Sequence, residues 1–216
     1  MSPRRALLAL AVAGTPLLQI AGMVPHPELA GTAAQTLAIV AEDPAEWFWI
    51  HLLAAAAAAL GIVSTLALAS LVRGRGAALA TIGAAMSVVG LFFLVFAFAA
   101  EAQLMSIAAD PSLDPATMAP LLDLQEEGPA MAMLAAGFPL SGIGGLLLHA
   151  GLIRSRVVPR WQPALVVFGT FTSIAATPGL AIGPLLFLPS VIGMLFLAVA
   201  VAKGAPARDS ELALAA

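Results

Sequence analysis

The amino-acid sequence predicts an all-α, polytopic integral membrane protein with six transmembrane helices, and composition and hydropathy carry this prediction. Hydrophobic residues make up 61% of the 216 residues and charged residues only 10%, whereas a soluble domain is about 45–50% apolar and about a quarter charged. Mean hydropathy is +1.02. A hydrocarbon core about 30 Å thick needs about 20 apolar residues of helix to cross it. The stretches that qualify are 6–24, 47–72, 77–100, 129–153, 161–180 and 184–202.

The first two spans have recognisable starts. The stretch 6–24 follows Arg4 and Arg5, as the apolar core of a signal peptide does, but it is long for such a core. No clear small-x-small cleavage site follows it, so we expect an uncleaved span. The span 47–72 follows Asp43-Pro44-Ala45-Glu46, which places an acceptor at the N-cap, proline at the first helical position and glutamate at the third.

The boundary between the last two spans is the weakest of the set. Residues 177–184 are themselves apolar, and only their prolines and glycines mark them as a turn. We expect a tight outer hairpin there. A re-entrant turn is the alternative, and it is tolerated in a membrane only where protein or water covers its backbone.

Two long outer loops, 25–46 and 101–128, and a cytoplasmic tail, 203–216, complete a single membrane domain over residues 1–216. Each loop contains a segment typical of a short interfacial helix. In the first loop it is Leu29–Glu42. In the second loop it begins at Asp114-Pro115, and Pro120 is expected to shorten it.

Charge predicts how the chain is oriented. With the spans placed in this way, all nine basic residues lie on one side of the membrane. Ten of the twelve carboxylates lie in the two long outer loops. Loops rich in lysine and arginine stay cytoplasmic, so we expect both termini to be cytoplasmic. The excess of arginine over lysine, with abundant alanine, favours a bacterial inner membrane. The basic residues are Arg4, Arg5, Arg73, Arg75, Arg154, Arg156, Arg160, Lys203 and Arg208.

An offset of 81 residues aligns parts of the chain with itself. It places Glu46 on Glu127 and Arg73 on Arg154. The alignment predicts that the hairpin of the second and third spans is a diverged copy of the hairpin of the fourth and fifth. Both copies have the same orientation, which makes this a parallel repeat.

Small residues predict which helix faces pack together, because close packing in lipid relies on small side chains. A stripe on the second span and a four-residue ladder on the fourth are expected to face the middle of the bundle. The stripe carries Ala54, Ala58, Gly61 and Thr65 below His51, and the ladder carries Gly137, Ser141 and Gly145 above His149.

Few ionisable groups lie within or beside the apolar spans, and such groups usually face the protein interior. We expect His51, Glu101 and Glu127 to form an outer polar cluster that binds a cation or passes a proton. The alternatives are structural. His51 is then a hydrogen-bonded interfacial histidine beside Trp47 and Trp49, and Glu101 is the first residue of its helix to meet water.

Several kinds of site are excluded or not expected. The chain has no cysteine, which excludes disulfides and thiolate metal sites. His51 and His149 belong to opposite ends of their spans and cannot ligate one haem. No catalytic or phosphate-loop motif is present, so we predict no catalytic residue and no cofactor, and the metal question stays open. The expected partners are the lipid bilayer and either another membrane protein or a second copy of the chain, with no nucleic acid.

These features favour a non-enzymatic accessory, scaffold or sensor component of a membrane over an enzyme, because polar groups within the spans are too few for an evident reaction. Two alternatives use the outer cluster. One is a small transporter or channel with a His/Glu entrance at its outer face. The other is an intramembrane metal-dependent or cofactor-containing protein.

Overall fold

The computed structural model describes residues 2–24, 26, 32–110, 112–126, 128–175 and 183–204, and these residues form eight α-helices with no strand among them. The all-helical fold class is therefore confirmed. Five helices, α1, α3, α4, α6 and α8, are long and apolar enough to cross a membrane, as a polytopic membrane protein requires. The helices are α1 (Pro3–Met23), α2 (Ala33–Glu42), α3 (Pro44–Leu71), α4 (Ala77–Ala108), α5 (Pro115–Glu126), α6 (Pro129–Ser155), α7 (Trp161–Ala175) and α8 (Gly183–Lys203).

Helix boundaries follow capping residues rather than the limits of apolar sequence. At the start of α3, the backbone N–H of Glu46 donates to Asp43 Oδ1 over 2.9 Å, which confirms the predicted cap. At the same end of the bundle, α4 does not stop at residue 100 but continues to Ala108. The first part of the predicted outer loop 101–128 is therefore helical, because residues 101–108 contain no proline or glycine and a helix need not be apolar to continue.

The antiparallel helices α4 and α6 pack along glycines that recur at every seventh residue. A Cβ built on Gly144 would lie 2.6 Å from the carbonyl oxygen of Gly83, and one built on Gly137 would lie 3.0 Å from that of Gly90. The two backbones therefore approach too closely for a side chain to fit between them. The facing pairs are Gly76 with Gly151, Gly83 with Gly144, and Gly90 with Gly137, where Gly76 directly precedes α4.

This interface corrects the predicted four-residue ladder on α6. Gly137 faces α4 and the backbone of Ser141 accepts a hydrogen bond from Ser87 of α4, but a Cβ built on Gly145 would meet nothing within 4 Å. Four residues advance around a helix by about 40° more than one full turn, whereas seven return to within about 20°. A four-residue ladder therefore winds off the contact line, and the packing prediction is wrong at Gly145.

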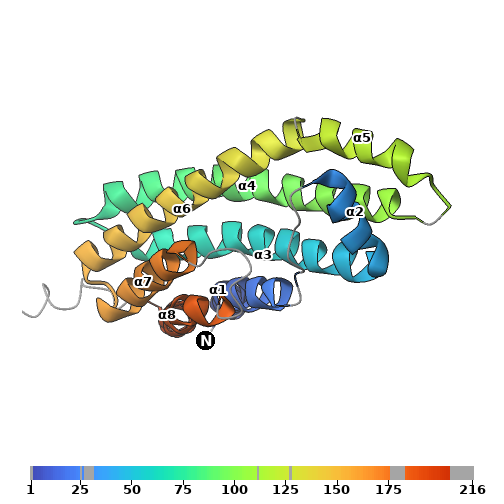
Figure 1. Cartoon of the computed structure of the whole chain (residues 1–216). Coiled ribbons are helices and arrows are strands. Elements are labelled where there is room, and N and C mark those ends of the chain that lie inside the picture. The colour runs from blue at the N-terminus through green and yellow to red at the C-terminus, as the bar shows by residue number, and fades with distance from the viewer. Residues whose placement is uncertain are drawn as a thin grey trace, which may run out of the picture.

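The stripe predicted on α3 is largely buried and packs against α1 and α4. Ala58, Gly61 and Thr65 are buried and Ala54 is half-buried. A Cβ on Gly61 would lie 3.2 Å from the side chain of Leu91 in α4, with α1 on its other side. Helix α4 lies between α3 and α6 (Figure 1), and α3 contacts α1, α4, α6 and α8.

The helices α7 and α8 form a second antiparallel pair. Ser190 of α8 donates a hydrogen bond of 2.9 Å to the carbonyl oxygen of Val166 in α7, and Gly169 lies against Ser190. The two hairpins predicted to be copies are α3–α4 and α6–α7. Helices α3 and α4 pack closely on each other, whereas α7 packs mainly on α8 and much less on α6. The last five residues of the predicted span 161–180, and the turn at 177–182, lie outside the described residues.

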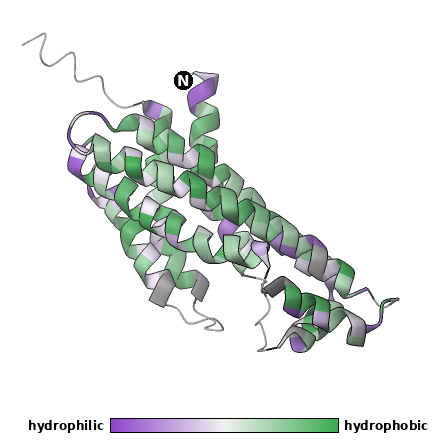
Figure 2. Ribbon diagram, turned by 90° about the horizontal axis from the view of Figure 1, so that it is seen from above, coloured by the Kyte–Doolittle hydropathy of each residue, from purple (hydrophilic) through white to green (hydrophobic). Residues whose placement is uncertain are grey.

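Polar residues gather at two ends of the bundle, with apolar residues between them (Figure 2). We call one of these ends the basic end. There the α3–α4 turn lies beside the end of α6, as shown by a Cβ built on Gly76, which would lie 3.3 Å from Arg154 Cβ. The start of α1 and the end of α8 lie there too, with the guanidinium of Arg5 beside Gly204. The turns that carry Arg73 and Arg154 therefore share one end, as the charge pattern predicts.

The opposite end, the acidic end, is covered by a cap of α2, α5 and the last turns of α4 (Figure 1). The two short helices predicted in the outer loops are confirmed in position. Pro120 lies inside α5 and does not end it, which corrects the expected shortening. The apolar residues of the cap are Leu37, Val40, Ala108, Ala109, Met118 and Leu122, and they pack with Trp47 of α3.

Large apolar side chains cover the outside of the long helices. Leu7 of α1, Leu66 of α3, Phe92 of α4 and Leu185 of α8 each expose more than half of their surface. Soluble proteins rarely expose apolar surface over a large continuous area. The exposed side chains therefore fit contact with lipid.

Candidate functional site

A largely buried imidazole and a carboxylate meet just below the cap. His51 lies about two turns after the start of α3, and Glu101 lies about two turns before the end of α4. His51 Nε2 is 3.8 Å from Glu101 Oε2, and the two side chains are 4% and 20% exposed. The structure thus brings together two of the three residues predicted as a polar cluster. The third, Glu127, lies outside the described residues.

The backbone of α3 sets the orientation of the His51 ring. His51 Nδ1 lies 2.9 Å from the carbonyl oxygen of Trp47, one turn earlier in the helix. A carbonyl oxygen can only accept, so Nδ1 carries a proton and donates it. In the neutral ring, Nε2 then presents a lone pair toward the Glu101 carboxylate, which is also an acceptor. These two acceptor groups repel each other. When one further proton is bound by either His51 or Glu101, the two side chains attract each other.

Aromatic rings surround the imidazole. The ring centroid of His51 lies 4.3 Å from that of Trp47, 5.2 Å from that of His26 and 6.4 Å from that of Phe98. Trp47 is only 2% exposed, whereas Trp49 is 59% exposed. The interpretation of an interfacial aromatic belt therefore suits Trp49 and not Trp47.

His26 is the member of this cluster that sequence reasoning missed. A signal was present, because His26 follows the first span by two residues and so has the depth at which the next long helix begins. The structure places its ring 5.5 Å from that of Trp47. Two imidazoles therefore lie beside the Trp47 indole, and the Glu101 carboxylate lies beside one of them, His51.

Trp47 connects this cluster to the cap. Its carbonyl oxygen holds His51, while its indole packs with Leu37 and Val40 of α2 and Leu122 of α5. The indole N–H is buried and has no hydrogen-bond partner among the residues that the structure describes. The Trp47 side chain is therefore in contact with both the His51 ring and the cap, so a shift of the ring can move the cap through this one residue.

Comparison with known proteins identifies the family. Residues 6–205 match the family described as Domain of unknown function (DUF4386). The chain belongs to the DUF4386 family. The match runs from α1 to the end of α8, and it includes His51 and Glu101. No curated protein and no solved structure matches the chain.

The His51–Glu101 cluster of this DUF4386 chain contains few metal-binding groups. Among the residues that the structure describes, no group of three or more histidine, aspartate or glutamate side chains is arranged to hold a metal ion. His51 and Glu101 supply two donors between them. Their Nε2 and Oε2 atoms, 3.8 Å apart, lie within ion-pair distance but beyond hydrogen-bond distance.

A second buried imidazole of the DUF4386 chain lies in the half of the bundle nearer the basic end. His149 Nδ1 is 2.7 Å from the carbonyl oxygen of Gly145, which repeats the geometry of His51 one turn along its helix. His149 Nε2 is buried and has no hydrogen-bond partner among the described residues. The two histidines belong to different halves of the bundle, as their positions in the sequence predict.

Proposed function

We propose that this chain is a non-enzymatic membrane component of the sensor or accessory kind, which responds to protonation of the His51–Glu101 pair. The observation that carries the proposal is the 3.8 Å approach of two acceptor atoms on side chains that are largely withdrawn from water. Electrostatic interactions are stronger in such surroundings than in bulk solvent. Gain or loss of one proton therefore changes the force between α3 and α4 at this point.

Connection to the cap supplies the response. When the pair holds the extra proton, His51 and Glu101 attract, and when they lose it their lone pairs repel. Because His51 is bonded to the carbonyl oxygen of Trp47 and stacks near its indole, we expect the indole to move with the ring. The indole is shared with α2 and α5, so the cap is the part expected to change its packing.

Tryptophan fluorescence tests this proposal directly. In a Trp49→Phe, Trp161→Phe background, Trp47 is the only tryptophan, and its emission in lipid nanodiscs is followed against pH. We expect a titration that His51→Gln abolishes and Glu101→Gln shifts. His149→Gln, the matched control in the other half of the bundle, should retain it, and His26→Gln separates the contribution of the second imidazole. An emission that does not titrate, or that titrates unchanged in His51→Gln, contradicts the proposal.

We further propose six crossings, with both termini on the cytoplasmic side of a bacterial inner membrane. Support comes from α7, which runs antiparallel to α8 and away from the basic end. Its 15 described residues extend about 22 Å, and the apolar sequence continues beyond them. Arginine-rich loops are retained in the cytoplasm, which favours this orientation of the basic end.

Single cysteines test the topology cleanly, since the chain has no cysteine of its own. A membrane-impermeant maleimide should label Ser112→Cys and Leu180→Cys in intact cells from which the outer barrier has been removed. It should label Arg73→Cys only after the membrane is permeabilised. Labelling of Leu180→Cys and Arg73→Cys from the same side would reduce the number of crossings and overturn this proposal.

The accessory role implies either a membrane-protein partner or a second copy of this chain. Cross-linking in native membranes followed by purification tests it. A reproducible cross-linked species of defined mass supports the role, and a chain that is recovered only as a monomer counts against it.

A small transporter is the second candidate function, and His149 is the observation that favours it. Its buried Nε2, which has no partner within the described part of the chain, gives the other half of the bundle a proton-binding group. Proton flux into liposomes should then fall in both His51→Ala and His149→Ala. The apolar cluster that fills that half of the bundle, with Val12, Leu148, Leu152 and Leu197 fully buried, favours the sensor instead.

A further inference from the structure

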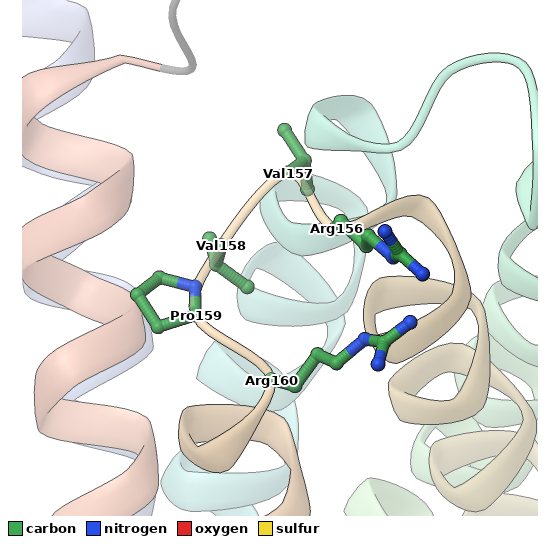
Figure 3. Close-up of a pocket in the computed structure, with 5 residues that line it drawn as sticks. All are labelled: Arg156, Val157, Val158, Pro159 and Arg160. Carbon is green, nitrogen blue, oxygen red and sulfur yellow. The ribbon is translucent and has the colours of Figure 1, made fainter.

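The loop that joins α6 to α7 forms an open, positively charged pocket at the basic end. Its volume is about 510 Å³ and it is lined by residues 156–160. The guanidinium groups of Arg156 and Arg160 point to the same side of the loop, while the ring of Pro159 points away (Figure 3). In the part of the chain that the structure describes, neither guanidinium pairs with a carboxylate.

The backbone at Arg156 is unusual for its residue type. Arg156 caps the end of α6 with φ 56° and ψ 24°, in the left-handed region. Glycine is the usual residue at such a position, and in this chain Gly74, Gly76 and Gly204 take the other positive φ values among the described residues. A long side chain at this position is unfavourable for the backbone. Its presence therefore indicates that the guanidinium itself has a role there.

Two further features fit an anion in the pocket. Arg160 stands immediately before α7, whose N-terminus carries a partial positive charge. Trp161 follows, with 48% of its surface exposed beside Phe196, as is typical of a side chain at the level of lipid headgroups. Arginine pairs bind phosphate through two parallel hydrogen bonds from each planar guanidinium.

From this geometry we infer that Arg156 and Arg160 bind the phosphate of an anionic phospholipid headgroup at the basic end of the bundle. The chemistry recognised is a phosphate group, and the lipid is its source because the pocket lies beside an exposed apolar helix surface and an interfacial tryptophan. Basic pockets at helix ends on one face of a membrane protein are suited to such headgroups. The site is separate from the His51–Glu101 pair, which belongs to the opposite end.

Quenching of Trp161 tests the site in the full-length chain. The protein, in a Trp47→Phe, Trp49→Phe background that leaves Trp161 as its one tryptophan, is placed in phosphatidylcholine nanodiscs that contain increasing fractions of phosphatidylglycerol with brominated acyl chains. We expect preferential quenching by the anionic lipid, and the preference should fall about fivefold in Arg160→Gln and in Arg156→Gly. The matched control Arg75→Gln removes the same charge from the other basic turn and should keep the preference.

Arg156→Gly also separates binding from folding. Since glycine adopts positive φ without strain, this variant should unfold at the same temperature as the parent chain or higher while it loses lipid selectivity. An equal loss in Arg75→Gln would mean diffuse surface charge and would overturn the site. Displacement of the brominated lipid by 10 mM inorganic phosphate would overturn the lipid as the source of the phosphate. Retained selectivity in Arg156→Gly would remove the role of the strained arginine.

Discussion

Adjacent glycines of α6 allow the α4–α6 contact to be tested with almost identical substitutions. A methyl group at residue 144 would lie 2.6 Å from the carbonyl oxygen of Gly83 and 2.7 Å from Ser87 Oγ, whereas a methyl group at residue 145 would meet nothing within 4 Å. Overpacking a close contact costs about 1–3 kcal/mol. Glycine to alanine in an open helix position gains about 0.5–1 kcal/mol.

Gly144→Ala should therefore destabilise the protein, and Gly145→Ala should stabilise it slightly. Both variants gain the same intrinsic helix preference, so their difference isolates the clash at about 1–3 kcal/mol. For a chain of this size, 1 kcal/mol shifts the melting temperature by about 2–4 °C. The expected gap between the two variants is then about 2–12 °C.

Thermal unfolding in one detergent, monitored by circular dichroism, measures this gap. A double variant, Gly144→Ala with Ser87→Gly, removes part of the obstacle and should recover some of the lost stability. Equal melting temperatures for Gly144→Ala and Gly145→Ala would refute the close approach of α4 and α6. A larger loss in Gly145→Ala would support the four-residue ladder that the sequence suggested.

Three further predictions follow from the cap and from the second helix pair. Trp47→Ala should cost about 3–5 kcal/mol and increase hydrogen exchange in α2 and α5, whereas the exposed Trp49→Ala should leave both helices protected. The Thr117 hydroxyl and the Ala116 N–H lower the pKa of Asp114 and cap α5. This carboxylate stabilises α5 at neutral and mildly acidic pH and stops doing so as the pH falls through its lowered pKa. Asp114→Ala should expose the first turn of α5 to exchange already at neutral pH, unlike Asp123→Ala. Gly169→Ala should lower the melting temperature, because its Cβ would meet Ser190 Oγ at 2.5 Å.

Local features of the sequence predicted the helix starts and the short cap helices well. Asp43, followed by proline and glutamate, supplies its own capping acceptor within three residues, so neighbouring sequence suffices to place the start of α3. The end of α4 was predicted too early, at residue 100. Loss of apolar character marks the edge of a hydrocarbon layer, while a helix ends where its residues stop favouring it.

The candidate site was predictable in part. His51 and Glu101 were expected together because both are ionisable groups at the same depth of neighbouring spans, and they lie 3.8 Å apart. His26 escaped notice because it follows the end of an apolar span, where polar residues are common. The burial of Trp47 was also not evident, since it depends on α2 and α5 folding back over it.

Composition and local sequence sufficed to predict that this chain is helical and apolar, where most of its helices begin and that its arginine-rich turns share one end. These properties depend on composition and on residues a few positions apart, which act without the rest of the fold. Packing in three dimensions established that α4 lies between α3 and α6, that glycines at seven-residue intervals form its contact with α6 and that Trp47 joins the His51–Glu101 pair to the cap. Such contacts depend on which helix faces meet in space, because small residues occur on several faces of each helix and only packing selects among them.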